Sequence, residues 1–300
     1  MTCTGLWPPV TTPFHADLSI DQTAFLAHCH ALLEEGATGL AVLGTTSEAN
    51  SLSMDERMGI VDAMISDGIP GDRILPGTGA CAVPDAIALS RHATRAGCAG
   101  VLLLPPFFYK GVSDDGLFSY VESVVQGVDD DRLQIYLYHF PGMTGGVSWS
   151  NELIARLRQA FPQAVVGLKD STGEWESTRS FIEENPGFAV FPANEALLAQ
   201  AVPLGAVGCI SATANVNARA LAKLLNALAA GESCDDMAEA ATALRKSFAS
   251  FPLVPAVKAI VGTRYNNPGW SRVRPPLSAL SDDQLKQLLS NPIWKGCVSS

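Results

Sequence analysis

The segment Val165-Val166-Gly167-Leu168-Lys169-Asp170-Ser171-Thr172-Gly173 has the pattern of a buried strand that runs into a polar turn. Its apolar first part is short, and Trp175–Glu184 follows it with the periodicity of an amphipathic helix. A buried strand followed by a surface helix is the repeating unit of parallel α/β proteins. The segment therefore predicts one strand–helix unit, with Lys169 at the carboxyl end of the strand.

The same unit recurs along the first two thirds of the chain. The expected strands cover residues 5–10, 40–43, 74–77, 101–104, 134–138, 165–169, 189–191 and 207–210. The helices expected after the first seven strands cover residues 20–35, 54–66, 84–96, 114–127, 149–160, 175–184 and 195–202. Eight parallel strands are the number that closes into a barrel, so we predict a (β/α)₈ TIM barrel over residues 1–216.

Beyond Asn217 the sequence shows helical patterns alone. They cover residues 218–230, 234–251, 254–263 and 282–289. We therefore expect residues 217–300 to form a C-terminal helical extension that packs on the barrel. The alternative is an open doubly wound sheet, which is disfavoured because no Gly-x-Gly-x-x-Gly motif follows the first strand.

Local signals mark where individual helices begin and end. Ser53 followed by Glu56 predicts a capping box at the start of the second helix. Gly36 falls where a glycine would end the first helix, because glycine adopts the left-handed conformation without steric cost. These signals agree with the boundaries that the periodicity predicts.

Composition excludes several classes of protein. The net charge is −10 and no cluster of Lys and Arg stands out, whereas a nucleic-acid partner would favour a basic stripe. The longest apolar run, at residues 101–108, is far shorter than a membrane span and contains Pro105 and Pro106. Residues 1–14 lack the basic start of a signal peptide. We expect neither nucleic acid nor membrane as a partner.

The cysteines indicate the compartment. The chain has 7 of them, an odd number, and none forms a Cys-x-x-Cys pair; the last is Cys297. Free thiols in a reducing compartment explain this pattern better than a set of disulfides. The sequence therefore predicts a cytoplasmic protein.

Lys169 is the first candidate for chemistry, because active sites of such barrels lie at the carboxyl ends of the strands. A lysine that attacks a carbonyl must lose its proton, and burial can lower a lysine pKa by up to ~3–5 units. A barrel mouth is therefore a feasible place for an amine nucleophile. The alternative is a structural lysine, either extended towards solvent or paired with the neighbouring Asp170.

Tyr138 ends the strand beside that of Lys169. Side chains alternate along a strand, so Tyr136 and Tyr138 share one face while Leu137 and His139 share the other. A phenol one strand away from Lys169 could relay protons to and from an adduct on the amine. Alternatively, Tyr138 is an amphipathic side chain at the rim of the core.

The segment Gly44-Thr45-Thr46-Ser47-Glu48 follows the second expected strand. Thr45 and Glu48 have the spacing of a capping box. A tight turn at Gly44 could also present backbone N–H groups and hydroxyls to an anion, such as the carboxylate of a 2-oxo acid. Both interpretations can hold together.

Four motifs in register resemble one family. They are residues 44–48, Tyr138 with Pro141, residues 167–173, and Gly208-Cys209-Ile210-Ser211-Ala212-Thr213-Ala214-Asn215. Together they resemble the dihydrodipicolinate synthase / N-acetylneuraminate lyase family of class I aldolases. Their order and spacing fit from Gly5 to the C-terminal helices.

The resemblance implies a role for each matching residue. Lys169 matches the lysine that forms the Schiff base, Tyr138 the catalytic tyrosine, and Thr45 the threonine of the proton relay. Thr46, after the turn at Gly44, matches the threonine that holds the carboxylate of pyruvate, and the carbonyl of Ile210 would line the site. The resemblance further implies a homotetramer, a dimer of dimers, with no metal and no organic cofactor.

Two positions depart from the pattern of the synthases. Met143 stands where the synthases carry an arginine that binds the carboxylate of the second substrate, and this loss is not conservative. Phe108 stands nearest to the position of the tyrosine that completes the relay across a subunit interface, with Tyr109 one residue further on. A phenylalanine cannot pass a proton, so Tyr109 must substitute or the relay is shorter.

The leading hypothesis is a Schiff-base lyase that cleaves or condenses a 4-hydroxy-2-oxo acid of sugar-acid type, with pyruvate as one half. Coupled dehydratase chemistry, which would make it a carbon–oxygen lyase, stays open beside carbon–carbon cleavage. Met143, His139 and either Phe108 or Tyr109 would shape the pocket for the aldehyde half, although His139 could equally be a buried polar residue that faces a helix. One alternative is 4-hydroxy-tetrahydrodipicolinate synthase, which condenses pyruvate with aspartate semialdehyde. Another is a barrel that binds 2-oxo acids without turnover. A phosphate-binding barrel is disfavoured because residues 208–211 form no glycine-rich phosphate loop.

Overall fold

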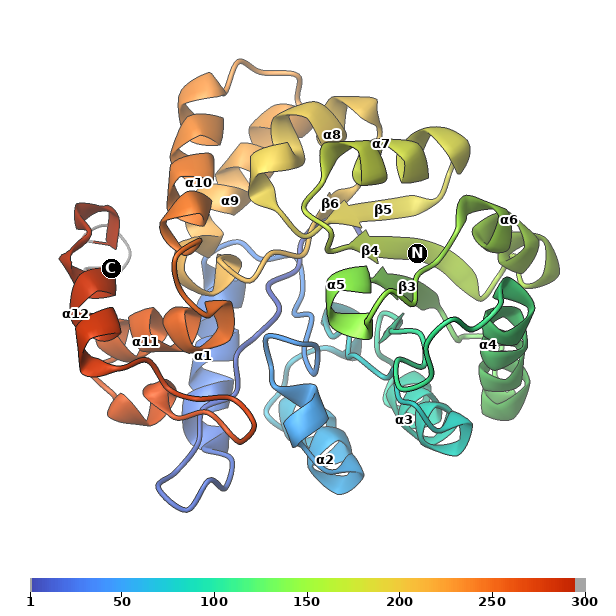
Figure 1. The fold of residues 1–300 in the computed structure, drawn as a ribbon, viewed down its shortest axis with the longest axis horizontal. Coiled ribbons are helices and arrows are strands. Elements are labelled where there is room, and N and C mark those ends of the chain that lie inside the picture. Colours follow the sequence, from blue (N-terminus) through green and yellow to red (C-terminus); the bar gives the residue numbers. More distant parts are fainter. Residues whose placement is uncertain (1, 295–300) are drawn as a thin grey trace.

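The computed structural model describes residues 2–294, which form a ring of parallel strands surrounded by helices (Figure 1). The regular strands are β1 (Gly5–Leu6), β2 (Val101–Leu103), β3 (Ile135–His139), β4 (Val165–Asp170), β5 (Ala189–Pro192) and β6 (Gly208–Cys209). β2, β3, β4 and β5 form one parallel sheet in that order, and β6 pairs in parallel with β1. The N–H of Val207 donates to the carbonyl of Val190, which joins β6 to β5.

Two of the eight expected strands appear as single bridges. Residues 40–43 and 74–77 connect to their neighbours through the parallel bridges Pro9–Ala41, Leu40–Ile74 and Gly77–Leu102. Proline has no N–H to donate to a sheet, and Pro8, Pro9 and Pro76 lie in these stretches. The ring nevertheless closes, and the predicted TIM barrel is confirmed.

A helix follows each strand of the ring. These helices are α1 (Gln22–Glu34), α2 (Met54–Ser66), α3 (Val83–Arg95), α4 (Asp114–Val128), α6 (Asn151–Ala160), α7 (Trp175–Glu184), α8 (Leu198–Leu204) and α9 (Ala214–Ala229). One extra turn, α5 (Pro141–Thr144), lies between β3 and α6. The short 3₁₀ turns are η1 (Ala49–Ser51), η2 (Gly71–Arg73), η3 (Glu195–Leu197), η4 (Pro268–Ser271) and η5 (Pro292–Trp294). The predicted capping box of Ser53 and Glu56 starts α2, and Gly36, at φ +100°, follows the end of α1.

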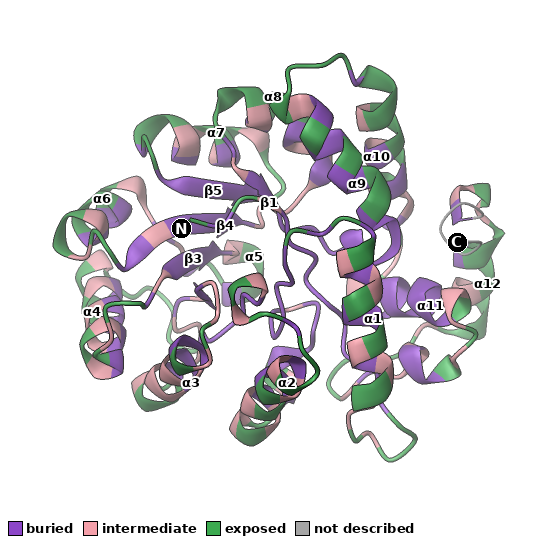
Figure 2. Ribbon diagram, turned by 180° about the vertical axis from the view of Figure 1, so that it is seen from behind, coloured by how far each residue is buried: buried purple, intermediate pink, exposed green. Residues whose placement is uncertain are grey.

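The strands of the ring are buried on both faces (Figure 2). Inside the ring, Trp7, Tyr136, Phe191 and Ile210 belong to one packed cluster, so the barrel is no pore. Leu137 points the opposite way, into the cluster between the strands and the helices. The predicted alternation along β3 is thus confirmed.

The C-terminal helices pack on one side of the barrel, beside α1 and α9 (Figure 1). They are α10 (Asp235–Ser247), α11 (Leu253–Arg264) and α12 (Asp282–Ser290), and Val257, Ile260 and Trp270 lie in the core that they share. α9 bends at Asn217 and contacts α8, β1 and α1. We propose that the barrel domain includes all of α9, so that the extension begins after it rather than at residue 217.

Within residues 2–294, no helix is both long enough and apolar enough to cross a membrane. The cysteines of this part of the chain are free thiols. Cys297 lies outside the described residues.

Candidate active site at the carboxyl ends of the strands

Lys169 lies at the mouth of the barrel with its side chain buried. In β4 it pairs with Tyr138 of β3 on one side and with Phe191 of β5 on the other. Residues paired across parallel strands point to the same face, which here is the interior of the ring. Only 3% of the surface of Lys169 is exposed, and its Nζ lies 4.1 Å from the centre of the Tyr138 ring.

The carboxylate of Asp170, the residue after Lys169, forms hydrogen bonds with other residues. Asp170 Oδ1 accepts hydrogen bonds from the N–H of Thr172, at 3.0 Å, and from its hydroxyl, at 2.8 Å. Oδ2 accepts from the hydroxyl of Thr178 at 2.7 Å. These bonds direct Asp170 towards α7, and no ion pair found within residues 2–294 involves Lys169. A pairing of Lys169 with Asp170 is therefore not observed.

Tyr138 connects the buried amine to the loop after residues 40–43. Its phenol oxygen lies 3.3 Å from the hydroxyl oxygen of Thr45. Burial tends to raise the pKa of Tyr138, but the positive charge of Lys169 and hydrogen bonds with Thr45, Ser171 and Lys169 outweigh it, so the pKa lies below its usual value of 10.0. A phenol that gives up its proton more readily than a free tyrosine suits a proton relay.

The loop that carries Thr45 has an unusual backbone. Leu43, at φ +60°, and Glu48, at φ +58°, are both in the left-handed region, which costs about 1–3 kcal/mol at a residue other than glycine. Between them, the Ser47 hydroxyl donates to the carbonyl of Val10 at 2.5 Å, and the Thr12 hydroxyl donates to the carbonyl of Ser47 at 2.8 Å. The loop is therefore held by contacts from outside it.

The predicted capping box of Thr45 and Glu48 is wrong. The N–H of Glu48 donates to the carbonyl of Thr45 at 3.1 Å, but its carboxylate reaches away from the loop. Its two oxygens bind Lys258 and the N–H of Arg274, both from the C-terminal extension. Sequence spacing alone could not reveal partners more than 200 residues away.

Open space lies beside Gly44 and Thr45. A Cβ at Gly44 would meet no atom within 4 Å, and a small cavity there is lined by Gly44, Thr45, Tyr138 and Asn50. The cavity also borders Arg57, a buried residue of α2 whose guanidinium donates to the carbonyl of Gly77 at 2.9 Å. Thr46, the next residue of the loop, is buried. No sequence motif pointed to Arg57.

On the opposite side of the mouth, Ile210 is fully buried and its N–H donates to the carbonyl of Pro192 at 3.2 Å. The two hydroxyls that follow it, from Ser211 and Thr213, both donate to the carboxylate of Glu195. Glu195 is itself buried, and no sequence motif pointed to it. This network holds the backbone around Ile210 in place.

Of the residues expected around the aldehyde half, three are exposed and His139 is buried. Met143, Phe108 and Tyr109 lie at the surface, with 64%, 71% and 73% of their area exposed. The rings of Phe108 and Tyr109 contact each other edge to face, 5.3 Å apart. Within one chain these side chains are therefore not buried together with Lys169.

The expectation that His139 shapes this pocket is wrong. Its ring packs on Phe181 of α7, 4.9 Å away, and Nδ1 accepts a hydrogen bond from the N–H of Trp149. Burial lowers the pKa of His139, although the charge of Asp170 opposes this effect. His139 is a buried polar residue on the helix side of β3.

Known proteins resemble this chain over most of its length. The model of the dihydrodipicolinate synthetase family matches residues 2–291. The 4-hydroxy-tetrahydrodipicolinate synthase of Azoarcus sp. (strain BH72) is 33% identical over 231 residues, 77% of either chain. An uncharacterized DapA-like lyase of Chloroflexus aurantiacus is 29% identical over 286 residues, 95% of this chain and 94% of the other.

Solved structures show the same fold. The dihydrodipicolinate synthase of Agrobacterium tumefaciens str. C58 superposes with a TM-score of 0.88 at 34% identity, over 98% of this chain and 99% of the other. YagE of E. coli K12, solved in complex with pyruvate, gives a TM-score of 0.87 at 29% identity, over 96% of each chain. The chain described here therefore belongs to the dihydrodipicolinate synthetase family, whose members are pyruvate-dependent class I lyases.

Proposed function

We propose that this protein is a class I aldolase that cleaves or condenses a 4-hydroxy-2-oxo acid, with pyruvate as one half and Lys169 as the Schiff-base residue. The observation that carries the proposal is the buried group of Lys169, Tyr138 and Thr45 at the mouth of the barrel. The amine is enclosed, a phenol lies against it, and a hydroxyl contacts the phenol. This is the set of groups that imine chemistry on a ketone needs.

In the cleavage direction, the neutral amine of Lys169 attacks the C2 carbonyl of the 2-oxo acid. Tyr138 passes a proton to the departing hydroxyl, and loss of water leaves a protonated imine. Tyr138 then takes the proton of the C4 hydroxyl, the C3–C4 bond breaks, and the aldehyde leaves. The bonding electrons move to the imine as an enamine, which is protonated at C3 and hydrolysed to pyruvate and free Lys169.

Thr45 has a supporting role in this proposal. Its hydroxyl oxygen lies near enough to the phenol oxygen to share the proton that Tyr138 gives up. Stabilising the phenolate in this way keeps Tyr138 competent in both directions of proton transfer. The lowered pKa of Tyr138 supports this assignment.

The carboxylate of the 2-oxo acid would bind beside the loop at residues 44–48. The open space at Gly44 leaves room for it, and the backbone N–H and hydroxyl of Thr46 are the donors that we assign to it. The carbonyl of Ile210 would face the substrate from the other side of the mouth. Its backbone is held there by the bond to Pro192.

Met143 favours an aldehyde half without a carboxylate. A thioether cannot provide the paired hydrogen bonds by which an arginine binds such a group. The name of the Azoarcus relative nevertheless favours a second candidate, 4-hydroxy-tetrahydrodipicolinate synthase. Measured rates with aspartate semialdehyde and with neutral hydroxyaldehydes distinguish the two.

The surface aromatic residues support a proposal about assembly. Phe108 and Tyr109 expose most of their area in a single chain, which is unfavourable unless another surface covers them. We include a homotetramer in the proposal, with Tyr109 reaching the site of a neighbouring subunit. A cytoplasmic location, which the free cysteines favour, is also part of it.

A panel of 4-hydroxy-2-oxo acids, assayed by release of pyruvate, tests the proposed function. We expect turnover of at least one sugar-acid type compound, and no turnover by Lys169→Ala. Lys223→Ala is the matched control, because Lys223 is an exposed lysine of α9. Equal activity of Lys169→Ala and the control would exclude the covalent mechanism, and saturable binding without turnover or imine would favour the non-catalytic barrel.

A further inference from the structure

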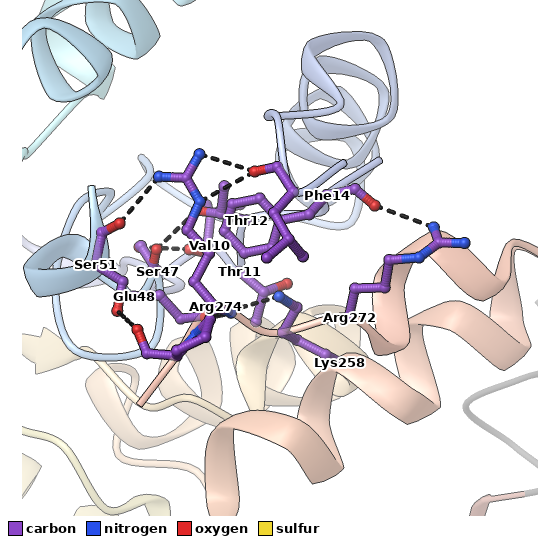
Figure 3. Close-up of polar contacts among 12 residues, drawn as sticks. Val10, Thr11, Thr12, Phe14, Ser47, Glu48, Ser51, Lys258, Arg272 and Arg274 are labelled. Carbon is purple, nitrogen blue, oxygen red and sulfur yellow. Dashed lines mark hydrogen bonds and ion pairs between the residues drawn. The ribbon is translucent and has the colours of Figure 1, made fainter. Parts of the chain in front are cut away.

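Two buried charges join the C-terminal extension to the loop that carries Thr45. Lys258 of α11 donates a hydrogen bond to Oε1 of Glu48, and the side chains of both residues are 0% exposed. Glu48 follows Thr45 by three residues. Figure 3 shows this ion pair between the loop and the helix of the extension.

Both the side chain and the backbone of Glu48 are hydrogen-bonded. Its Oε2 accepts from the N–H of Arg274 at 2.8 Å, so both carboxylate oxygens are held by the extension. Its own N–H donates to the carbonyl of Thr45 at 3.1 Å, and its carbonyl accepts from the N–H of Ser51 at 2.8 Å. A continuous path of contacts therefore runs from Lys258 through Glu48 and Thr45 to Tyr138.

Arg274 holds the following residues of the same segment. Its guanidinium donates to the carbonyl of Ser51 at 2.9 Å and to both carboxylate oxygens of Glu56, which forms the α2 capping box with Ser53. It also lies over the ring of Phe14, 4.9 Å from the centre, and Lys258 Nζ lies 4.4 Å from the same centre (Figure 3). The extension thus contacts residues 48–56 at several points.

Stability alone is a poor explanation for this arrangement. Removing two charges from water is costly, and apolar side chains of similar size often give an equally stable core. A buried ion pair can instead specify one geometry. Fixing one geometry matters at Glu48, because its left-handed backbone conformation persists only when the surrounding contacts impose it.

We propose that Glu48, Lys258 and Arg274 are positioning residues, through which the C-terminal extension holds the Thr45 hydroxyl against Tyr138. They touch neither the substrate nor Lys169 in this account. The proposal rests on the function proposed above for Thr45 and Tyr138. It assigns a catalytic purpose to the extension, which otherwise only covers one side of the barrel.

The variant Glu48→Gln/Lys258→Met tests the proposal. Removing both charges avoids leaving one of them buried alone, and the amide oxygen introduced by Glu48→Gln could still accept from the N–H of Arg274. Arg274→Gln is a second variant at a less buried position, which keeps the backbone N–H bond to Glu48 but removes the guanidinium contacts with Ser51 and Glu56. The control is Glu35→Gln/Arg264→Met, which removes another ion pair between α11 and the barrel, at the C-terminal end of α1 and away from the loop.

We expect kcat to fall about 10- to 100-fold in the first variant, as for a catalytic group displaced by a fraction of an ångström, with little change in KM for the 2-oxo acid. In a Thr45→Val background the same substitutions should lower kcat less than about twofold, because the positioned hydroxyl is already absent. The control should lose thermal stability without a change in kcat. Equal losses in both backgrounds would show a merely structural role and overturn the proposal.

A measurement without substrate separates this proposal from the proposed function. With tyrosines labelled at the ring carbon that bears the hydroxyl, NMR reports the titration of Tyr138, assigned with Tyr138→Phe. Loss of the Thr45 contact should raise the titration midpoint of Tyr138 in Glu48→Gln/Lys258→Met and in Arg274→Gln, but not in the control. An unchanged midpoint in both variants overturns the positioning role, whether or not the wild type turns over any aldol substrate.

Discussion

The hydroxyl oxygen of Thr45 lies 3.3 Å from the phenol oxygen of Tyr138, although 93 residues separate the two along the chain. The barrel brings them together, because Tyr138 lies near the carboxyl end of β3 and Thr45 directly follows residues 40–43, and both ends open at the same mouth. Nζ of Lys169 lies over the ring of the same tyrosine, 4.1 Å from its centre. One tyrosine thus touches both the proposed nucleophile and the hydroxyl proposed to stabilise its phenolate.

Replacing Tyr138 with phenylalanine should lower kcat by about 100-fold or more, because general acid–base catalysis contributes roughly 10²–10⁴. Thr45→Val should lower kcat by a smaller factor, and the double variant should be no slower than Tyr138→Phe alone. Steady-state assays of pyruvate release measure all three. A double variant that shows the product of the two single effects would mean that Thr45 acts independently of Tyr138.

Met143→Arg should change the choice of aldehyde. An arginine there could offer two parallel hydrogen bonds to a carboxylate, so kcat/KM for aspartate semialdehyde should rise relative to a neutral hydroxyaldehyde by about tenfold or more. Competition assays with both aldehydes and limiting pyruvate measure the ratio. Met143→Gln, which is polar but uncharged, is the control. The same ratio for both variants would mean that position 143 does not contact the aldehyde half.

The stability of the fold should fall in acid because of His28. Burial lowers the pKa of His28 to about 4 from 6.5, with Nε2 bonded to Asn215 and Nδ1 to Tyr265. Between these two pH values, His28 binds a proton in the unfolded chain but stays neutral in the native protein. The free energy of unfolding is therefore highest above pH 6.5 and declines as the pH falls towards 4.

This linkage predicts a loss of about 2 kcal/mol between pH 7 and pH 5 from His28 alone. Urea unfolding of the wild type and of His28→Gln at the two pH values measures it, since the variant lacks the titrating ring. His30→Gln on the same helix is the exposed control. A wild type and a His28→Gln variant with parallel pH profiles would refute the assignment.

The sequence predicts the fold well because one pattern dominates it. Buried strands and amphipathic helices alternate strongly enough that the ranges of α2 and α7 match the expected residues at both ends. Residues 40–43 and 74–77 were expected as strands and occur as bridges, because nearby prolines remove the N–H groups that longer ladders need.

The site was predictable only in part. Lys169 and Tyr138 sit at strand ends, where register places them together, and the alternation along β3 already assigns His139 to the helix side. Glu48 could not be paired with Lys258 from local spacing, since packing of the extension on the barrel brings them together. The exposed positions of Met143 and Tyr109 likewise depend on the short turn α5 and on the loop after β2, whose courses no periodicity predicts.

The central claim is that Lys169 forms an imine with pyruvate, and reductive trapping tests it most directly. The protein is treated with pyruvate and borohydride, digested, and mapped by mass spectrometry, with samples lacking pyruvate and the Lys169→Ala variant as controls. We predict one reduced pyruvate adduct, on the peptide that contains Lys169, and none in either control. An adduct on another lysine in place of Lys169, or no adduct at saturating pyruvate, would contradict the account.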